Sequence, residues 1–147
     1  MLICVALAFG AAPGASAQGL KVEERGGVRF VHGGIGAEER AVLQAMRAEY
    51  NVHMTFAVAR QGNFVADVAV SLVDGGGREV LRTVAEGPLL LAKLPPGTYA
   101  VTATFDGKAQ MRKLTVRDKG RAELYLYWDD PSVRNSSDME PGPRPAK

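Results

Sequence analysis

The pattern of apolar and polar residues changes near residue 63. Before that point, apolar residues alternate over residues 28–31 and 52–58, which predicts two strands. Between them, apolar residues recur at spacings of three and four, at Val42, Leu43, Met46 and Tyr50. This spacing predicts one amphipathic helix over residues 37–50. The predicted order is therefore strand, helix, strand.

From residue 63 to residue 128 the chain consists of short apolar runs separated by turn residues. Pro95-Pro96-Gly97 and Asp106-Gly107 are strong turn signals, because these residue types adopt the dihedral angles that tight turns require. Six strands are expected, at residues 66–73, 78–84, 89–94, 98–105, 108–116 and 121–128. Short strands at this spacing predict an antiparallel sandwich.

One of these strands shows a change of phase. Met111 has the opposite parity to Leu114 and Val116, so the three residues cannot share one face of a regular strand. This change predicts a β-bulge near Arg112 or Lys113.

A set of turn and strand residues within residues 67–116 carries a family resemblance. The set comprises Asp74, Gly77, Leu94-Pro95-Pro96-Gly97-Thr98-Tyr99, Val101 and Gly107. On these residues the stretch resembles a carboxypeptidase regulatory-like domain, the transthyretin-like (prealbumin-like) sandwich of many bacterial envelope proteins. The resemblance implies a fold rather than a reaction. The expected fold is a mainly β, antiparallel, transthyretin-like (Ig-like) sandwich of six to seven strands, with an N-terminal β-α-β segment that contains one amphipathic helix.

The sequence departs from two relatives of that family. The His-x-x-Glu motif of zinc carboxypeptidase catalytic domains is absent, because Ile35 and Phe56 follow the two histidines at that spacing. Similar sandwiches in adhesins carry a Lys-to-Asn isopeptide bond, but residues 121–128 contain no asparagine. Neither the catalytic activity nor the covalent bond is therefore expected.

The two ends of the chain differ from its centre. Residues 1–17 are uncharged, largely apolar and end in Ala15-Ser16-Ala17, which predicts a signal peptide cleaved after Ala17. The only cysteine, Cys4, lies in this segment, so no disulfide is expected in the mature chain. Residues 129–147 are rich in proline and predict a disordered tail. An αβ segment at 18–62 and the sandwich at 63–128 complete the expected organisation.

Composition narrows the functional classes. A chain of 147 residues with 46% hydrophobic and 23% charged residues is typical of one globular protein. The formal net charge of +2 is too small to predict a nucleic-acid partner. After residue 17, no apolar segment approaches the length of a membrane span. Together with the predicted signal peptide, the lack of such a segment makes the expected location periplasmic or secreted.

The glycine-rich stretch at residues 33–36 has the form of a phosphate-binding loop between a strand and a helix. However, Glu38 and Glu39 occupy the first helical turn, where they would repel a phosphate. We therefore expect Gly36 to cap the helix and no nucleotide to bind.

The residues for metal binding or catalysis are sparse. If the strands beside the helix are parallel, His32 and His53 lie about 10–15 Å apart, too far to share one metal ion. The mature chain has no cysteine and no nucleophilic serine motif, so we expect neither a cofactor nor an enzyme. A hydrolase would instead require a cleft that gathers acids such as Asp67, Glu79 and Glu123.

The remaining candidates are binding residues. The hairpin at residues 106–121 is rich in cations, including Lys108, Arg112 and Lys113, which either meet an acidic partner or protect a sheet edge. Tyr125 and Tyr127 point away from the apolar face of their strand, so they are either exposed for binding or covered by the helix. Because the amphipathic helix must bury its apolar residues against a surface, cover by the helix is the favoured interpretation. The sequence thus predicts a non-catalytic envelope module that acts through protein–protein interaction. The alternative is glycan binding through the same tyrosines and the basic hairpin.

Overall fold

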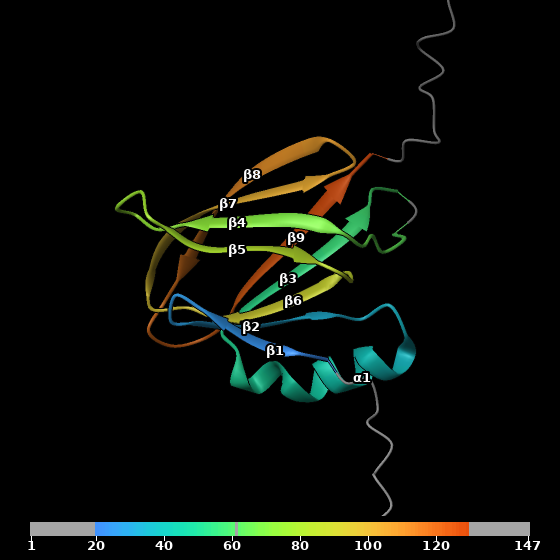
Figure 1. Ribbon diagram of the computed structural model, residues 1–147, viewed down its shortest axis with the longest axis horizontal. Helices are drawn as coiled ribbons and strands as arrows, with labels where there is room; N and C mark the ends of the chain where they lie inside the picture. The colour runs from blue at the N-terminus through green and yellow to red at the C-terminus, as the bar shows by residue number, and fades with distance from the viewer. Residues whose placement is uncertain (1–19, 61, 130–147) are drawn as a thin grey trace, which may run out of the picture.

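The computed structural model describes residues 20–60 and 62–129 (Figure 1). The predicted signal peptide and all but the first residue of the predicted tail lie outside the described residues. Within the described ranges, no helix has the length and hydrophobicity that a membrane crossing requires.

The described residues form a mainly β structure of nine strands in two sheets. Figure 1 shows how these strands and the helix are arranged. Sheet A has the order β1 (Val22–Arg25), β2 (Val28–Gly33), β6 (Leu89–Lys93), β3 (Val52–Val58), β9 (Ala122–Trp128). Sheet B has the order β5 (Glu79–Ala85), β4 (Val68–Val73), β7 (Gly97–Phe105), β8 (Lys108–Val116). The expectation of a mainly β, two-sheet architecture is confirmed at this level.

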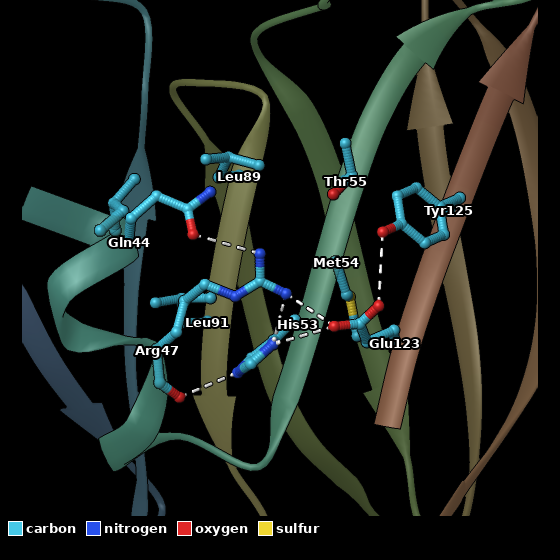
Figure 2. Close-up of a pocket in the computed structure, with 10 residues that line it drawn as sticks. Gln44, Arg47, His53, Met54, Thr55, Leu89, Leu91, Glu123 and Tyr125 are labelled. Atoms are coloured by element: carbon cyan, nitrogen blue, oxygen red, sulfur yellow. Dashed lines mark hydrogen bonds and ion pairs between the residues drawn. The ribbon is translucent and has the colours of Figure 1, made fainter. Parts of the chain in front are cut away.

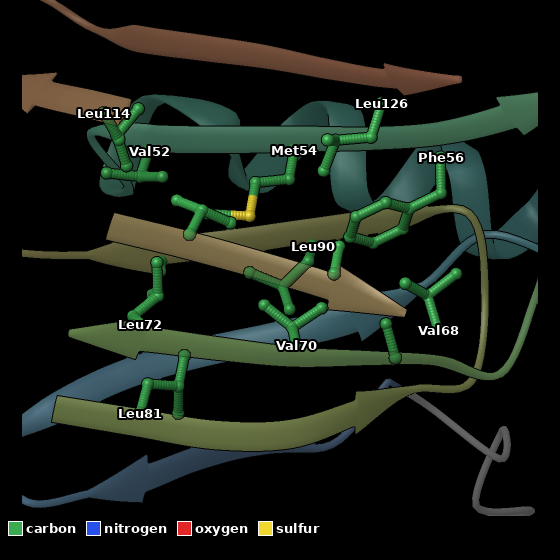
Figure 3. Packing of buried hydrophobic residues seen from close by; sticks show 14 of the residues in the cluster. Val52, Met54, Phe56, Val68, Val70, Leu72, Leu81, Leu90, Leu114 and Leu126 are labelled. Carbon is green, nitrogen blue, oxygen red and sulfur yellow. The ribbon is translucent and has the colours of Figure 1, made fainter. Parts of the chain in front are cut away.

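The core lies between the two sheets. The strands of sheet B largely alternate buried and exposed residues, whereas β3 and β6 of sheet A are buried on both faces. Figure 3 shows Met54 and Phe56 of sheet A meeting Val70 and Leu72 of sheet B. Each of these four side chains is at most 1% exposed. Burying an apolar side chain of this size contributes about 1.5–3 kcal/mol, so this burial is the main stabilising feature of the sandwich.

The predicted helix begins at Ala37, with Gly36 as its N-cap, as expected. It is α-helical as α1 (Ala37–Met46) and ends in a short 3-10 turn, η1 (Arg47–Glu49). Its buried residue Leu43 packs with Val31 of β2, Leu91 of β6 and Tyr50 in a second, smaller apolar cluster. The helix therefore covers the outer face of sheet A over β2 and β6.

The N-terminal strands are members of the sandwich rather than a layer packed onto it. β2 and β3 are each antiparallel to β6, which lies between them, so β2 and β3 run parallel to one another. The β-α-β order is confirmed, but its two strands are separated by a strand from residues 89–93. Sheet A thus combines strands from both halves of the sequence.

Two finer expectations are corrected. The final strand does not continue an antiparallel meander, because β9 pairs in parallel with β3 of sheet A. The expected bulge near Arg112 or Lys113 is absent, since β7 and β8 pair in continuous register and Met111 simply faces solvent. The register shift in sheet B lies instead between Leu72 and Val73.

A strand in the polar lead-in was not expected. β1 pairs with β2 through a tight turn in which Gly26 and Gly27 have φ values of 56° and 81°. Because β1 is an edge strand with little burial, its sequence lacks an apolar alternation. The Gly-Gly pair, a common hairpin turn, is the one sequence signal that could have identified it.

Candidate functional site

The tyrosines of β9 lie on the outer face of sheet A and the helix does not cover them. Tyr125 is 50% exposed and Tyr127 is 51% exposed, whereas Leu126 and Trp128 on the opposite face are buried in the core. Strand alternation produces this division, as the sequence pattern predicts. The favoured interpretation, that the helix covers these tyrosines, is therefore wrong, because α1 packs over β2 and β6 instead.

A polar cluster of Arg47, His53, Glu123 and Tyr125 connects the end of the helix to β9 (Figure 2). Arg47 Nη2 donates to Glu123 Oε1 at 2.6 Å and contacts His53 Nδ1 at 3.1 Å. The Tyr125 hydroxyl donates to Glu123 Oε2 at 3.3 Å. Because Glu123 and Arg47 lie 76 positions apart in the chain, no local sequence signal indicated their contact.

The hydrogen bonds of His53 define its tautomer. Nε2 lies 3.0 Å from the carbonyl oxygens of both Arg47 and Tyr50, which only accept hydrogen bonds. Nε2 therefore carries the hydrogen, and Nδ1 accepts from the Arg47 guanidinium. Both ring nitrogens of this buried histidine are occupied by the protein itself, so the imidazole caps the carbonyl groups at the end of the helix.

The space beside this polar cluster is small. A cavity of about 20 Å³ lies between the helix and sheet A, lined in part by Gln44, Thr55 and Leu89. This volume is sufficient for about one water molecule. A substrate or cofactor therefore does not fit between the helix and the sheet in this arrangement.

The three candidate cations of the basic hairpin point in two directions. Antiparallel partners share a face, and Lys108, Gln110 and Arg112 pair with Phe105, Ala103 and Val101. Lys108 and Arg112 therefore have inward parity, while Lys113 lies on the outer face of sheet B. All three are exposed, and none forms an ion pair with another described residue.

β8 is one of the two edge strands of sheet B, which agrees with the interpretation that its cations protect an edge. Two contacts place the start of β8 beside the end of β9. Gln110 Nε2 donates to the Tyr127 carbonyl, and Trp128 Nε1 donates to the Lys108 carbonyl at 2.9 Å. The structure thus brings the hairpin and the tyrosine strand together at one side of the sandwich, although on different faces.

The glycine-rich connection is occupied by the protein's own side chains. The Gly34 amide, a donor that a phosphate would require, donates to Glu39 Oε2 at 2.9 Å. Arg40 Nη1 donates to the carbonyls of Gly34 and Ile35. The carboxylate of Glu39 therefore takes the position of an anion at this loop.

The histidines and the candidate acids are dispersed. His32 pairs with the core residue Leu90, and His53 pairs with Leu91, so the two imidazoles lie on opposite faces of sheet A. Within residues 20–60 and 62–129, no group of three or more metal-binding side chains is present.

Glu79 and Glu123 lie on different sheets, and each is paired with an arginine. Hydrogen bonds from Arg82 and then Ser71 hold the pKa of the Glu79 carboxyl below its usual value. The described residues therefore do not gather these two acids in one cleft.

Comparison with known proteins adds no assignment: no protein-family model matches the chain, and no curated protein is similar to it at a significant level.

Proposed function

We propose that the protein is a non-catalytic exported module of the bacterial envelope that binds another protein through the outer face of β9. The observation that carries this proposal is the half-exposed pair Tyr125 and Tyr127 on a strand that has a paired neighbour on one side only. Tyrosine combines an apolar ring with a polar tip and is enriched at binding hot spots. The pair is rigidly presented, because its backbone is fixed by β3.

The polar cluster supports binding rather than catalysis. Both nitrogens of His53 are engaged, and the Glu123 carboxylate is held by Arg47 and Tyr125. A general base requires a free acceptor within reach of the substrate proton. The cluster instead fixes the end of the helix and one of the tyrosines, which reduces the entropy that Tyr125 loses when a partner binds.

The family and the location belong to the same proposal. Two mainly antiparallel sheets support the transthyretin-like resemblance of residues 67–116, and the apolar first segment supports export. In that family the sandwich accompanies many unrelated functions, so the binding role is inferred from the tyrosine face and not from the fold.

Site-specific photo-crosslinking in cells tests the protein partner. A photoreactive phenylalanine analogue replaces Tyr125 or Tyr127, and the matched control carries it at Met111, which is 68% exposed on sheet B. We expect one discrete crosslinked protein from the two β9 positions and none from Met111. Equal crosslinking from all three positions, or none from β9, contradicts the proposal.

Glycan binding is the second candidate, favoured by the same two tyrosine rings beside cations that have no ion pair. Aromatic faces can stack on sugar rings, and the cations of β8 would attract acidic glycans. Titration with neutral and acidic envelope oligosaccharides tests it. A saturable signal that is lost when Tyr125→Ala and Tyr127→Ala are combined supports this function, and an unchanged signal contradicts it.

A further inference from the structure

The outer edge of β9 presents backbone groups that sheet A does not use. Ala122 N donates to the Asn51 carbonyl, and the Trp128 carbonyl accepts from Ala59 N. Because strand residues alternate, the even-numbered residues of β9 direct their N–H and C=O groups toward β3. Glu123, Tyr125 and Tyr127 therefore direct theirs toward the opposite edge.

This edge is largely open among the described residues. Of the backbone groups along this edge, the Tyr127 carbonyl accepts a hydrogen bond from Gln110 of β8. The other side-chain link to β8, from Trp128 Nε1 to the Lys108 carbonyl, uses no backbone group of β9. The backbone groups of Glu123 and Tyr125 are not paired with β8, since β8 belongs to the other sheet. An open edge of this kind is a template for one further strand.

The side chains beside the edge give it a charge preference. Lys108 and Arg112 have inward parity on β8, on the side of sheet B that faces sheet A, and they have no ion-pair partner in the described part of the chain. A strand added to β9 would lie alongside these two cations. Two copies of this chain paired through β9 would bring both sets of cations together, which disfavours a second copy as the occupant.

We propose that the β9 edge binds an extended acidic segment of a partner protein as an added strand. This inference rests on the proposed protein-binding function and names the chemistry of the partner. Backbone hydrogen bonds to Glu123 and Tyr125 supply affinity, and Lys108 and Arg112 select acidic side chains. Tyr125 and Tyr127 then contact the residues of the added strand that face outward from sheet A.

Synthetic peptides test the strand and the charge separately. The probes are a short peptide that alternates valine with glutamate, its valine–lysine counterpart, and the acidic peptide N-methylated at consecutive central residues. We expect saturable binding of the acidic peptide by fluorescence anisotropy. The lysine and N-methylated peptides should bind at least about tenfold more weakly. The lysine peptide carries the opposite charge, and the N-methylated peptide lacks the N–H groups that strand pairing requires.

Protein variants test the location. Combining Lys108→Glu with Arg112→Glu should lower the affinity for the acidic peptide by about tenfold or more and allow the lysine peptide to bind. Lys113→Glu is the matched control, since Lys113 lies on the outer face of sheet B, and should change neither affinity substantially. In the unmodified protein, the acidic peptide should slow hydrogen exchange at the amides of Glu123 and Tyr125.

The outcomes separate this inference from the proposed function. Equal binding of the acidic and N-methylated peptides, or of acidic oligosaccharides and acidic peptides, overturns strand addition and indicates a general attraction for anions. Crosslinking from Tyr125 and Tyr127 without any acidic-peptide binding retains the proposed function and overturns the strand. If neither crosslinking from the tyrosines nor binding of the acidic peptide is observed, both the proposed function and the strand addition are overturned.

Discussion

Two buried tyrosine hydroxyls differ in how the structure satisfies them. The Tyr99 hydroxyl donates to the Pro95 carbonyl at 2.7 Å, within the turn that precedes β7. The Tyr50 hydroxyl is buried without a hydrogen-bond partner among the described residues, and the Arg29 guanidinium lies over its ring, 5.9 Å from the centroid. The ring of Tyr50 thus makes apolar contacts beneath the helix, whereas its hydroxyl group makes no hydrogen bond to the described residues.

This difference predicts opposite responses to removal of each hydroxyl. Tyr99→Phe should lower the free energy of unfolding by about 1 kcal/mol, because it deletes a hydrogen bond. Tyr50→Phe should leave it unchanged or raise it by up to about 1 kcal/mol, since it removes an unsatisfied buried group. Urea denaturation of both variants measures the two values. A larger loss from Tyr50→Phe than from Tyr99→Phe would contradict this account.

Gly87 shows how closely two loops approach at the residue scale. A Cβ at this position would lie 2.3 Å from the carbonyl carbon and oxygen of Gly33, which are backbone atoms at the end of β2. The connection from β5 to β6 therefore requires glycine for space.

Gly87→Ala should destabilise the fold by about 1–3 kcal/mol or more, because overpacking against backbone forces it to move. Gly75→Ala is the matched control, since the nearest contact there is the Thr98 carbonyl oxygen at an ordinary 3.8 Å. Thermal unfolding compares the two, and equal melting temperatures would show that the loops separate freely.

At the scale of elements, the helix is attached to sheet A by one apolar cluster and by the polar cluster around His53. Leu43 is 1% exposed against β2 and β6, while its neighbour Val42 is 48% exposed. The polar cluster then fixes the helix end to β3 and β9. The position of the helix therefore leaves the tyrosine face of β9 open.

Leu43→Ala should lower the free energy of unfolding by about 2–5 kcal/mol, the usual cost of a cavity at a buried leucine. Val42→Ala, one residue away on the same helix, should change it by less than about 0.5 kcal/mol. Chemical denaturation followed by circular dichroism gives both values. A loss of similar size for the two variants would mean that Leu43 is not the main apolar anchor of the helix.

At the scale of the whole molecule, burial of two tyrosines links stability to alkaline pH. Burial is the main cause that raises the pKa of the Tyr50 and Tyr99 hydroxyls above the ordinary value of 10.0. Tyr50 lies beneath the helix and Tyr99 lies in the core between the sheets. In both apolar clusters, burial therefore favours the protonated form of the tyrosine.

The free energy of unfolding should fall as the pH rises above 10. In that range the unfolded chain releases the two protons while the folded protein retains them, so the stability present below pH 10 is lost. The slope is at most about 1.4 kcal/mol per pH unit for each tyrosine. Denaturation at several pH values measures it.

Combining Tyr50→Phe with Tyr99→Phe should flatten this dependence. An alkaline slope that is identical in this variant and in the unmodified protein would assign the effect to other groups.

The sequence by itself determined the local elements of this protein. Alternation and turn residues located eight of the nine strands that the structure describes, and helical spacing located α1 with Gly36 as its cap. The division of β9 into a buried face and a tyrosine face also followed from spacing alone. These features depend on neighbours a few positions apart, so a single sequence contains the information.

Only the tertiary structure decided how those elements pair. The placement of β6 between β2 and β3, the parallel pairing of β9 with β3, and the contact of Arg47 with Glu123 all join distant positions. Alternation shows that a strand has a buried face, but it does not show which strand lies beside it. The open edge of β9 and the cations along it were therefore visible only once the two sheets were assembled.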